Sequence, residues 1–145
     1  MRKSLISLAI LAAVLLSGCS VVEDLNNSLE YTNQAMEHVD TWNSFGQEAP
    51  QLIQNAATNP EAKAELEAKL TNLIAEIDEF NQLEPPGIAE GIHQQIVEKN
   101  EALKGVIENA MVNGEVALEK LENSELLKLI NEVTELRNMI EGLGA

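Results

Sequence analysis

Apolar side chains recur every three or four residues along most of the chain between residues 22 and 143. Because an α-helix has about 3.6 residues per turn, this spacing places them on one helix face. The first segment, over about 22–52, has two adjacent stripes and can therefore contact two partner helices. The stripes are Val22, Leu25, Leu29, Thr32, Met36, Val39, Asn43 and Gly46, and beside them Tyr31, Ala35, His38, Trp42, Phe45, Ala49 and Leu52.

A second helix is predicted between two sets of turn residues. Asn59 is its N-cap and Pro60 its first residue, a position where a proline loses no hydrogen bond. The run Pro85-Pro86-Gly87 forbids continuation, so the helix ends near Glu84. The residues predicted to face inward are Leu66, Leu70, Leu73, Ile77 and Phe80.

Two more helices are predicted in the remainder of the chain. One covers about 87–112, with Asn113-Gly114 as its C-terminal cap. A short helical turn follows over 115–121, and Ser124 caps the last helix, which ends at Gly142 and Gly144. The inward residues are Ile92, Ile96, Leu103, Val106, Ile107 and Ala110, and then Leu126, Leu129, Val133, Leu136, Ile140 and Leu143.

Four amphipathic helices joined by short turns predict an all-α fold, an antiparallel up-and-down bundle over residues 22–145. We see no strand pattern. Pro50 lies within the first helix and either kinks it or restarts it, because proline removes an internal hydrogen bond. Gly46 makes a bend nearby easier.

The first eighteen residues have the three zones of a secretory signal. Arg2 and Lys3 precede an apolar run, and the run ends in Leu16-Ser17-Gly18-Cys19, which resembles the lipobox of bacterial lipoproteins. We predict cleavage between Gly18 and Cys19, diacylglycerol on the Cys19 thiol, and a short tether over 19–21. The alternative is an uncleaved transmembrane helix, but such a span needs about 20 apolar residues and this run is shorter.

Removal of the leader with its two basic residues changes the formal charge from −15 to −17. This charge argues against nucleic acid, whose phosphates are bound by basic side chains. It also argues against a bundle that lies flat on anionic lipid. The acidity serves solubility, or it attracts basic partners or cations of the cell envelope. Cys19 is the one cysteine, so the acylated protein has no disulfide.

The second stripe of the first helix holds three of the four aromatic residues. Tyr31, His38, Trp42 and Phe45 are either core residues packed between helices or a surface that faces a partner. Aromatic side chains are common anchors of protein interfaces, which motivates the second interpretation.

The sequence contains few residues that could form a metal-binding or catalytic site. Glu90 and His93 are three residues apart on one helix face, which is half of a di-iron arrangement, and the second Glu–His pair is missing. His93 is more simply a residue near the surface that bonds neighbouring groups. No nucleophile accompanies either histidine, and no phosphate-binding loop or zinc spacing occurs, so we predict neither an enzyme nor a cofactor.

Several segments resemble a family of small uncharacterised lipoproteins from spore-forming Gram-positive bacteria. They are the lipobox, the start Val22 to Asn27, the stretch 79–86 with its double proline, and the stretch 88–96 with His93 one turn into its helix. The resemblance covers essentially the whole chain. It implies an all-helical body at the cell membrane and implies no activity.

We therefore expect a non-catalytic lipoprotein anchored at the extracytoplasmic face of the cell membrane, which binds an envelope protein or associates with itself. The alternative is a binder of a small molecule or metal inside the bundle. Asn33, Asn43 and Asn100 lie on or beside the inner stripes. They could line such a cavity or fix the helix register by pairing with each other.

Overall fold

The computed structural model describes residues 18–143, with side chains from residue 26 onward. The predicted signal peptide therefore lies outside the described residues except for Gly18, and so does the side chain of Cys19. Within the described part, no helix contains a stretch long and apolar enough to cross a membrane.

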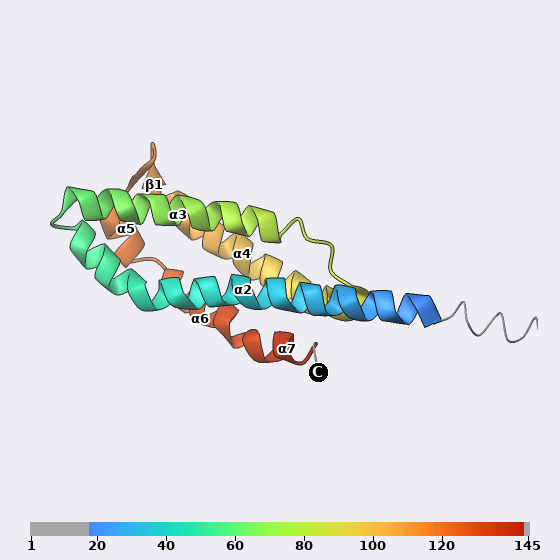
Figure 1. The fold of residues 1–145 in the computed structure, drawn as a ribbon. Coiled ribbons are helices and arrows are strands. Elements are labelled where there is room, and N and C mark those ends of the chain that lie inside the picture. Colours follow the sequence, from blue (N-terminus) through green and yellow to red (C-terminus); the bar gives the residue numbers. More distant parts are fainter. Residues whose placement is uncertain (1–17, 144–145) are drawn as a thin grey trace, which may run out of the picture.

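The main helices form an all-α bundle, as predicted (Figure 1). Successive long segments run in opposite directions, and the two C-terminal helices together form the fourth. A short β-hairpin projects from one end. The elements are α2 (Gly18–Ala56), α3 (Pro60–Phe80), the 3₁₀ turn η1 (Gly87–Ala89), α4 (Glu90–Ala110), β1 (Met111–Val112), β2 (Glu115–Val116), α5 (Leu118–Glu122), α6 (Leu126–Glu135) and α7 (Arg137–Glu141).

Most of the predicted inward positions form the core. On α3 all five are buried, and on α4 and the C-terminal helices the principal ones are buried too. On α2 the second stripe is buried except for the partly buried Leu52, whereas in the first stripe Val39 is buried and Leu29 is 50% exposed. The buried positions of α2 are Tyr31, Ala35, His38, Val39, Trp42, Phe45, Ala49, Ile53 and Ala56.

The turn between α2 and α3 follows the predicted capping chemistry. The Asn59 side-chain oxygen accepts hydrogen bonds from the amides of Glu61 (2.8 Å) and Ala62 (3.4 Å), and Pro60 is the first helical residue. These bonds satisfy amides that have no partner inside the helix. Upstream, α2 continues through Pro50 without a break and bends near its C-terminal end (Figure 1).

The prediction of Asn113-Gly114 as a helix cap is wrong. These residues form the turn of a hairpin whose strands pair Met111 with Val116 and Val112 with Glu115. Both have positive φ, 54° and 85°, as the central residues of a type I′ turn require. Asn-Gly is the strongest short hairpin signal, and the expectation of no strands missed it because each strand is two residues long.

The last predicted helix is two helices. The amide of Leu136 bonds to the carbonyl of Val133, three residues back, at 3.1 Å. This tighter turn ends α6, and α7 begins at the next residue. The short helical turn expected over 115–121 is α5, which begins three residues later and ends one residue later than predicted, because β2 occupies 115–116.

Candidate functional site

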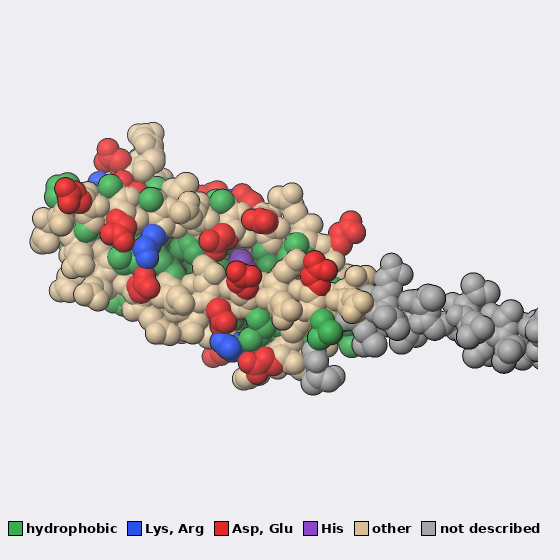
Figure 2. Space-filling view, in the orientation of Figure 1, with side chains coloured by type: hydrophobic (Ala, Val, Ile, Leu, Met, Phe, Trp, Pro, Cys, Tyr) green, Lys and Arg blue, Asp and Glu red, His purple; other side chains and the backbone are tan. Residues whose placement is uncertain are grey.

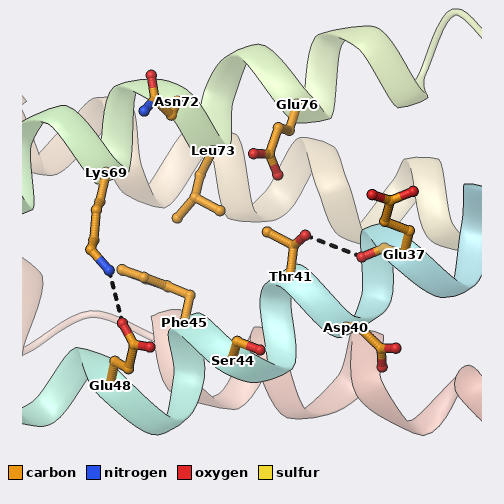
Figure 3. Close-up of a pocket in the computed structure, with 10 residues that line it drawn as sticks. All are labelled: Glu37, Asp40, Thr41, Ser44, Phe45, Glu48, Lys69, Asn72, Leu73 and Glu76. Carbon is orange, nitrogen blue, oxygen red and sulfur yellow. Dashed lines mark hydrogen bonds and ion pairs between the residues drawn. The ribbon is translucent and has the colours of Figure 1, made fainter.

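A groove runs along the surface between α2 and α3. Two adjoining hollows of about 460 and 370 Å³ share Glu37, Thr41 and Glu76, and together they form what we term the acidic groove. Figure 3 shows how residues of the larger hollow point toward one another from the two helices. The remaining lining residues are Gln34, His38, Asp40, Ser44, Phe45, Glu48, Lys69, Asn72, Leu73, Glu79, Phe80 and Leu83.

Helical spacing explains the polar edges of the groove. On each helix a row of polar residues, three or four apart, lies next to the buried stripe and therefore borders the line where the helices meet. The buried Phe45, Leu73 and Phe80 give the groove an apolar floor. The rows are Glu37, Thr41, Ser44 and Glu48 on α2, and Lys69, Asn72, Glu76 and Glu79 on α3.

On this face of the molecule acidic side chains outnumber basic ones (Figure 2). Lys69 is the one cation that lines the groove, and its Nζ lies 2.8 Å from Glu48 Oε2, as the dashed line in Figure 3 marks. Among the described residues, Glu37, Glu76 and Glu79 form no ion pair.

The cations elsewhere in the described chain are already engaged. Lys63, Lys99, Lys104, Lys128 and Arg137 each pair with one or more carboxylates. Lys120 Nζ donates to the Asn109 carbonyl at 3.4 Å. Because none of these cations pairs with the three free carboxylates, a positive charge from outside the chain would be their natural counter-ion.

Electrostatic repulsion within the groove acts on Glu76. Burial raises the pKa of this carboxyl, and the neighbouring charges of Glu79 and Glu37 raise it further. A raised pKa means that the negative charge is costly there, so a bound cation would relieve the cost.

Below the groove lies a stack of three rings from three helices. Phe80 of α3 stands between His38 of α2, with centroids 4.3 Å apart, and His93 of α4, at 5.3 Å. Tyr31 Oη lies 3.1 Å from His93 Nδ1. Burial lowers the pKa of His93 and raises that of Tyr31 to about 12. The Tyr31 hydroxyl therefore stays protonated and can donate to a neutral His93.

A chain of side-chain hydrogen bonds runs from His38 toward the surface. His38 Nε2 lies 2.9 Å from Asn100 Oδ1, Asn100 Nδ2 donates to Asn81 Oδ1 at 2.9 Å, and Asn81 Nδ2 donates to Glu101 Oε1 at 2.8 Å. Asn100 is fully buried. Burial lowers the pKa of His38, and the bond to Asn100 opposes this shift in part.

The interpretation of the aromatic stripe as a partner-facing surface is corrected by these contacts. Tyr31, His38, Trp42 and Phe45 are 4, 7, 1 and 5% exposed. They face inward because the helices pack on the wider, aromatic side of α2, and only the edges of His38 and Phe45 reach the groove.

The other candidate residues have separate surroundings. His93 is buried, not near the surface as expected, and its Nδ1 is hydrogen-bonded to the Tyr31 hydroxyl, while Glu90 is exposed. No group of three or more metal-ligating side chains comes together among the described residues. Of the three asparagines, Asn100 is buried, Asn43 is partly buried and Asn33 is exposed.

Sequence reasoning missed the groove carboxylates and Asn81. In so acidic a chain no single glutamate stands out. The available signal was the pair of polar rows beside the inner stripes, which meet only after the pairing of α2 with α3 is known.

Comparison with known proteins gives a family and a relative. The model of a family of unknown function, DUF6376, matches residues 31–143. An uncharacterised lipoprotein of Bacillus subtilis (strain 168), YybP, is 38% identical, and the match covers 96% of this chain and 98% of that protein. No solved structure is significantly similar. The expected likeness to uncharacterised lipoproteins of spore-forming bacteria is confirmed.

Proposed function

This chain belongs to the DUF6376 family, whose function is unknown, so we propose a role from the geometry of the site. We propose that it is a non-catalytic lipoprotein that binds a basic, amphipathic segment of another envelope protein in the acidic groove. Lipid on Cys19 would hold it at the extracytoplasmic face of the cell membrane. The lipobox-like sequence and the lipoprotein relative support this address.

The observation that carries the proposal is the set of unpaired carboxylates above an apolar floor. Glu37, Glu76 and Glu79 have no cation of their own among the described residues, and Phe45 and Leu73 lie beneath them. A segment with lysines or arginines on one side and leucine-like residues on the other matches both features. Complementary charge would also steer such a partner to the groove.

The test uses the full chain, purified from membranes in mild detergent, and a labelled ten-residue peptide of alternating lysine and leucine pairs. We expect binding at pH 7.5 that weakens with salt, because exposed charges are screened. A peptide of lysine and serine, with the same charge, should bind more weakly because it cannot use the apolar floor.

The double substitution Glu37→Gln and Glu76→Gln removes two groove charges without changing side-chain size. It should weaken peptide binding roughly 5- to 30-fold, since each exposed charge contributes on the order of 0.5–1 kcal/mol. Glu65→Gln with Glu122→Gln is the matched control, because these exposed residues lie outside the groove and lose the same charge.

The same variant separates binding from folding. Loss of the repulsion at Glu76 should leave thermal stability unchanged or raise it. Weaker binding by a protein of equal or higher melting temperature supports the groove. Equal peptide affinity in the groove and control variants would refute it.

A further inference from the structure

Two neighbours of His38 require opposite protonation states of the same ring nitrogen, Nε2. His38 Nε2 lies 2.9 Å from Asn100 Oδ1, and the Trp42 indole Nε1–H points at the same atom from 3.3 Å. The indole nitrogen can only donate, so it requires a lone pair on Nε2.

The amide chain requires the opposite. The Glu101 carboxylate, when ionised, only accepts, so Asn81 must turn its NH₂ group toward it. Asn81 then accepts from the Asn100 NH₂ group, and the Asn100 carbonyl is left facing His38. This carbonyl needs a proton on Nε2. A neutral ring therefore satisfies either Trp42 or Asn100, and not both.

Protonation of the ring resolves the conflict in one direction. An imidazolium carries a proton on Nε2 in every case, so it donates to Asn100 and leaves the Trp42 N–H without its acceptor. The amide dipoles that lead to Glu101 all point their oxygen ends toward His38 and favour this state. Trp42 packs edge-to-face on Phe45, with centroids 6.4 Å apart, so a shift of the indole reaches the groove floor directly.

His38 also lines the groove that it would control. The charged groups that face it are Glu37 on α2 and Glu76 and Glu79 on α3, with Glu101 of α4 at the end of the amide chain. Nearby cations are held elsewhere: Lys99 by Glu132, Lys104 by Asp78, and Arg137 by Asp40. Figure 2 shows a histidine at the surface among acidic side chains.

From this geometry we infer that His38 is a proton sensor for the acidic groove: when the ring gains a proton, Trp42 loses its acceptor, the groove gains a positive charge, and a bound basic segment is released. This inference rests on the proposed function. It adds the condition under which the groove empties.

Trp42 is the one tryptophan in the chain, so it reports on His38 without a label. An imidazolium beside an indole quenches its fluorescence because it accepts an electron from the excited state. The experiment titrates the full chain in mild detergent from pH 8 to pH 5 and records tryptophan emission and affinity for the lysine–leucine peptide together.

The variants are His38→Gln, whose side-chain NH₂ can still donate to Asn100 but does not titrate in this range, and His93→Gln as the matched control. We expect emission and peptide affinity to fall together in the unmodified protein, by at least threefold in affinity, with a midpoint below pH 6.5. The step should persist in His93→Gln and vanish in His38→Gln.

Each contrary outcome has a separate meaning. Peptide binding at pH 7.5 that weakens equally in His38→Gln would overturn the sensor and leave the proposed function standing. Absence of binding at any pH would refute the proposed function and the release step with it. Melting curves at pH 7.5 establish that His38→Gln is folded. If it is not, the ring proton resonances of the two histidines in the unmodified protein decide. A His38 that does not titrate at the emission midpoint overturns the inference.

Discussion

The close contact between α2 and α6 makes Gly46 a sensitive position. A Cβ atom added there would lie 2.7 Å from Ile130 Cγ2, against an ordinary carbon–carbon separation of about 3.5–4.0 Å. Ile130 is 2% exposed and, as a β-branched residue in a helix, has little rotamer freedom. The substitution Gly46→Ala therefore forces the helices apart or strains the isoleucine.

Two opposing effects determine how much Gly46→Ala changes the free energy of unfolding. Alanine in a helix interior is more favourable than glycine by about 1 kcal/mol. Overpacking of a tight core contact costs about 1–3 kcal/mol. We expect the free energy of unfolding of Gly46→Ala to be unchanged or lower by up to about 2 kcal/mol, a noticeable part of the roughly 5–15 kcal/mol typical of a domain.

Gly105 provides the matched control. It also lies inside a long helix, α4, and a Cβ there would meet nothing within 4 Å. Gly105→Ala should therefore stabilise the protein by about 1 kcal/mol. The difference between the two alanine variants isolates the packing cost from the helix propensity.

Urea denaturation followed by far-ultraviolet circular dichroism measures the free energy of unfolding of both alanine variants. Ile130→Ala, which removes Cγ2, should cost about 2–5 kcal/mol alone, and less in the Gly46→Ala background, where it relieves the clash. If Gly46→Ala stabilises the protein as much as Gly105→Ala does, the tight contact is not there and the reasoning fails.

Three other expectations concern the core and the anchor. Asn100→Ala should lower the unfolding free energy by about 1–3 kcal/mol, because it strips a buried partner from His38, whereas the exposed Asn33→Ala should change it little in the same denaturation assay. The free energy of unfolding should be highest above about pH 6.5 and should fall as the pH drops from there through the lowered pKa values of His38 and His93. The reason is that the unfolded chain binds more protons than the folded chain in this range. Melting temperatures that stay constant from pH 7.5 to 5.5 would contradict this expectation. Cys19→Ala should leave an uncleaved precursor or release the protein from membranes, and mature protein that still sediments with membranes would disprove the anchor.

Periodicity predicted the parts of the fold in which one helix face is strongly apolar. Leu66, Leu70, Leu73 and Ile77 follow a single stripe, and all are buried. On α2 the two adjacent stripes predicted one wide inward face. The structure buries most of the aromatic stripe and Val39 of the other but leaves Leu29 exposed, because packing against α3 and α6 decides how much of that face is covered and the α2 sequence alone does not.

The remaining differences have local causes. Asn113-Gly114 favours a hairpin turn but also occurs at helix ends, and here the hairpin brings Val116 into a buried position against the bundle. The place of His93 in the first turns of its helix predicts a position near the surface. Tyr31, 62 residues earlier, covers it. Contacts between distant residues of this kind cannot be derived from spacing along one helix.

The length of α2 has a mechanical consequence. Its 39 residues extend about 58 Å, whereas the 21 residues of α3 extend only about 31 Å. With lipid on Cys19, as proposed, the anchor would lie at the N-terminal end of the continuous helix α2. The groove would then have a fixed orientation about the axis of that helix. One residue inserted between the anchor and Tyr31 would move the groove about 1.5 Å farther from the anchor but rotate it by about 100° about the helix axis. Access of a partner to the groove would therefore depend far more on the direction in which the groove faces than on its distance from the membrane.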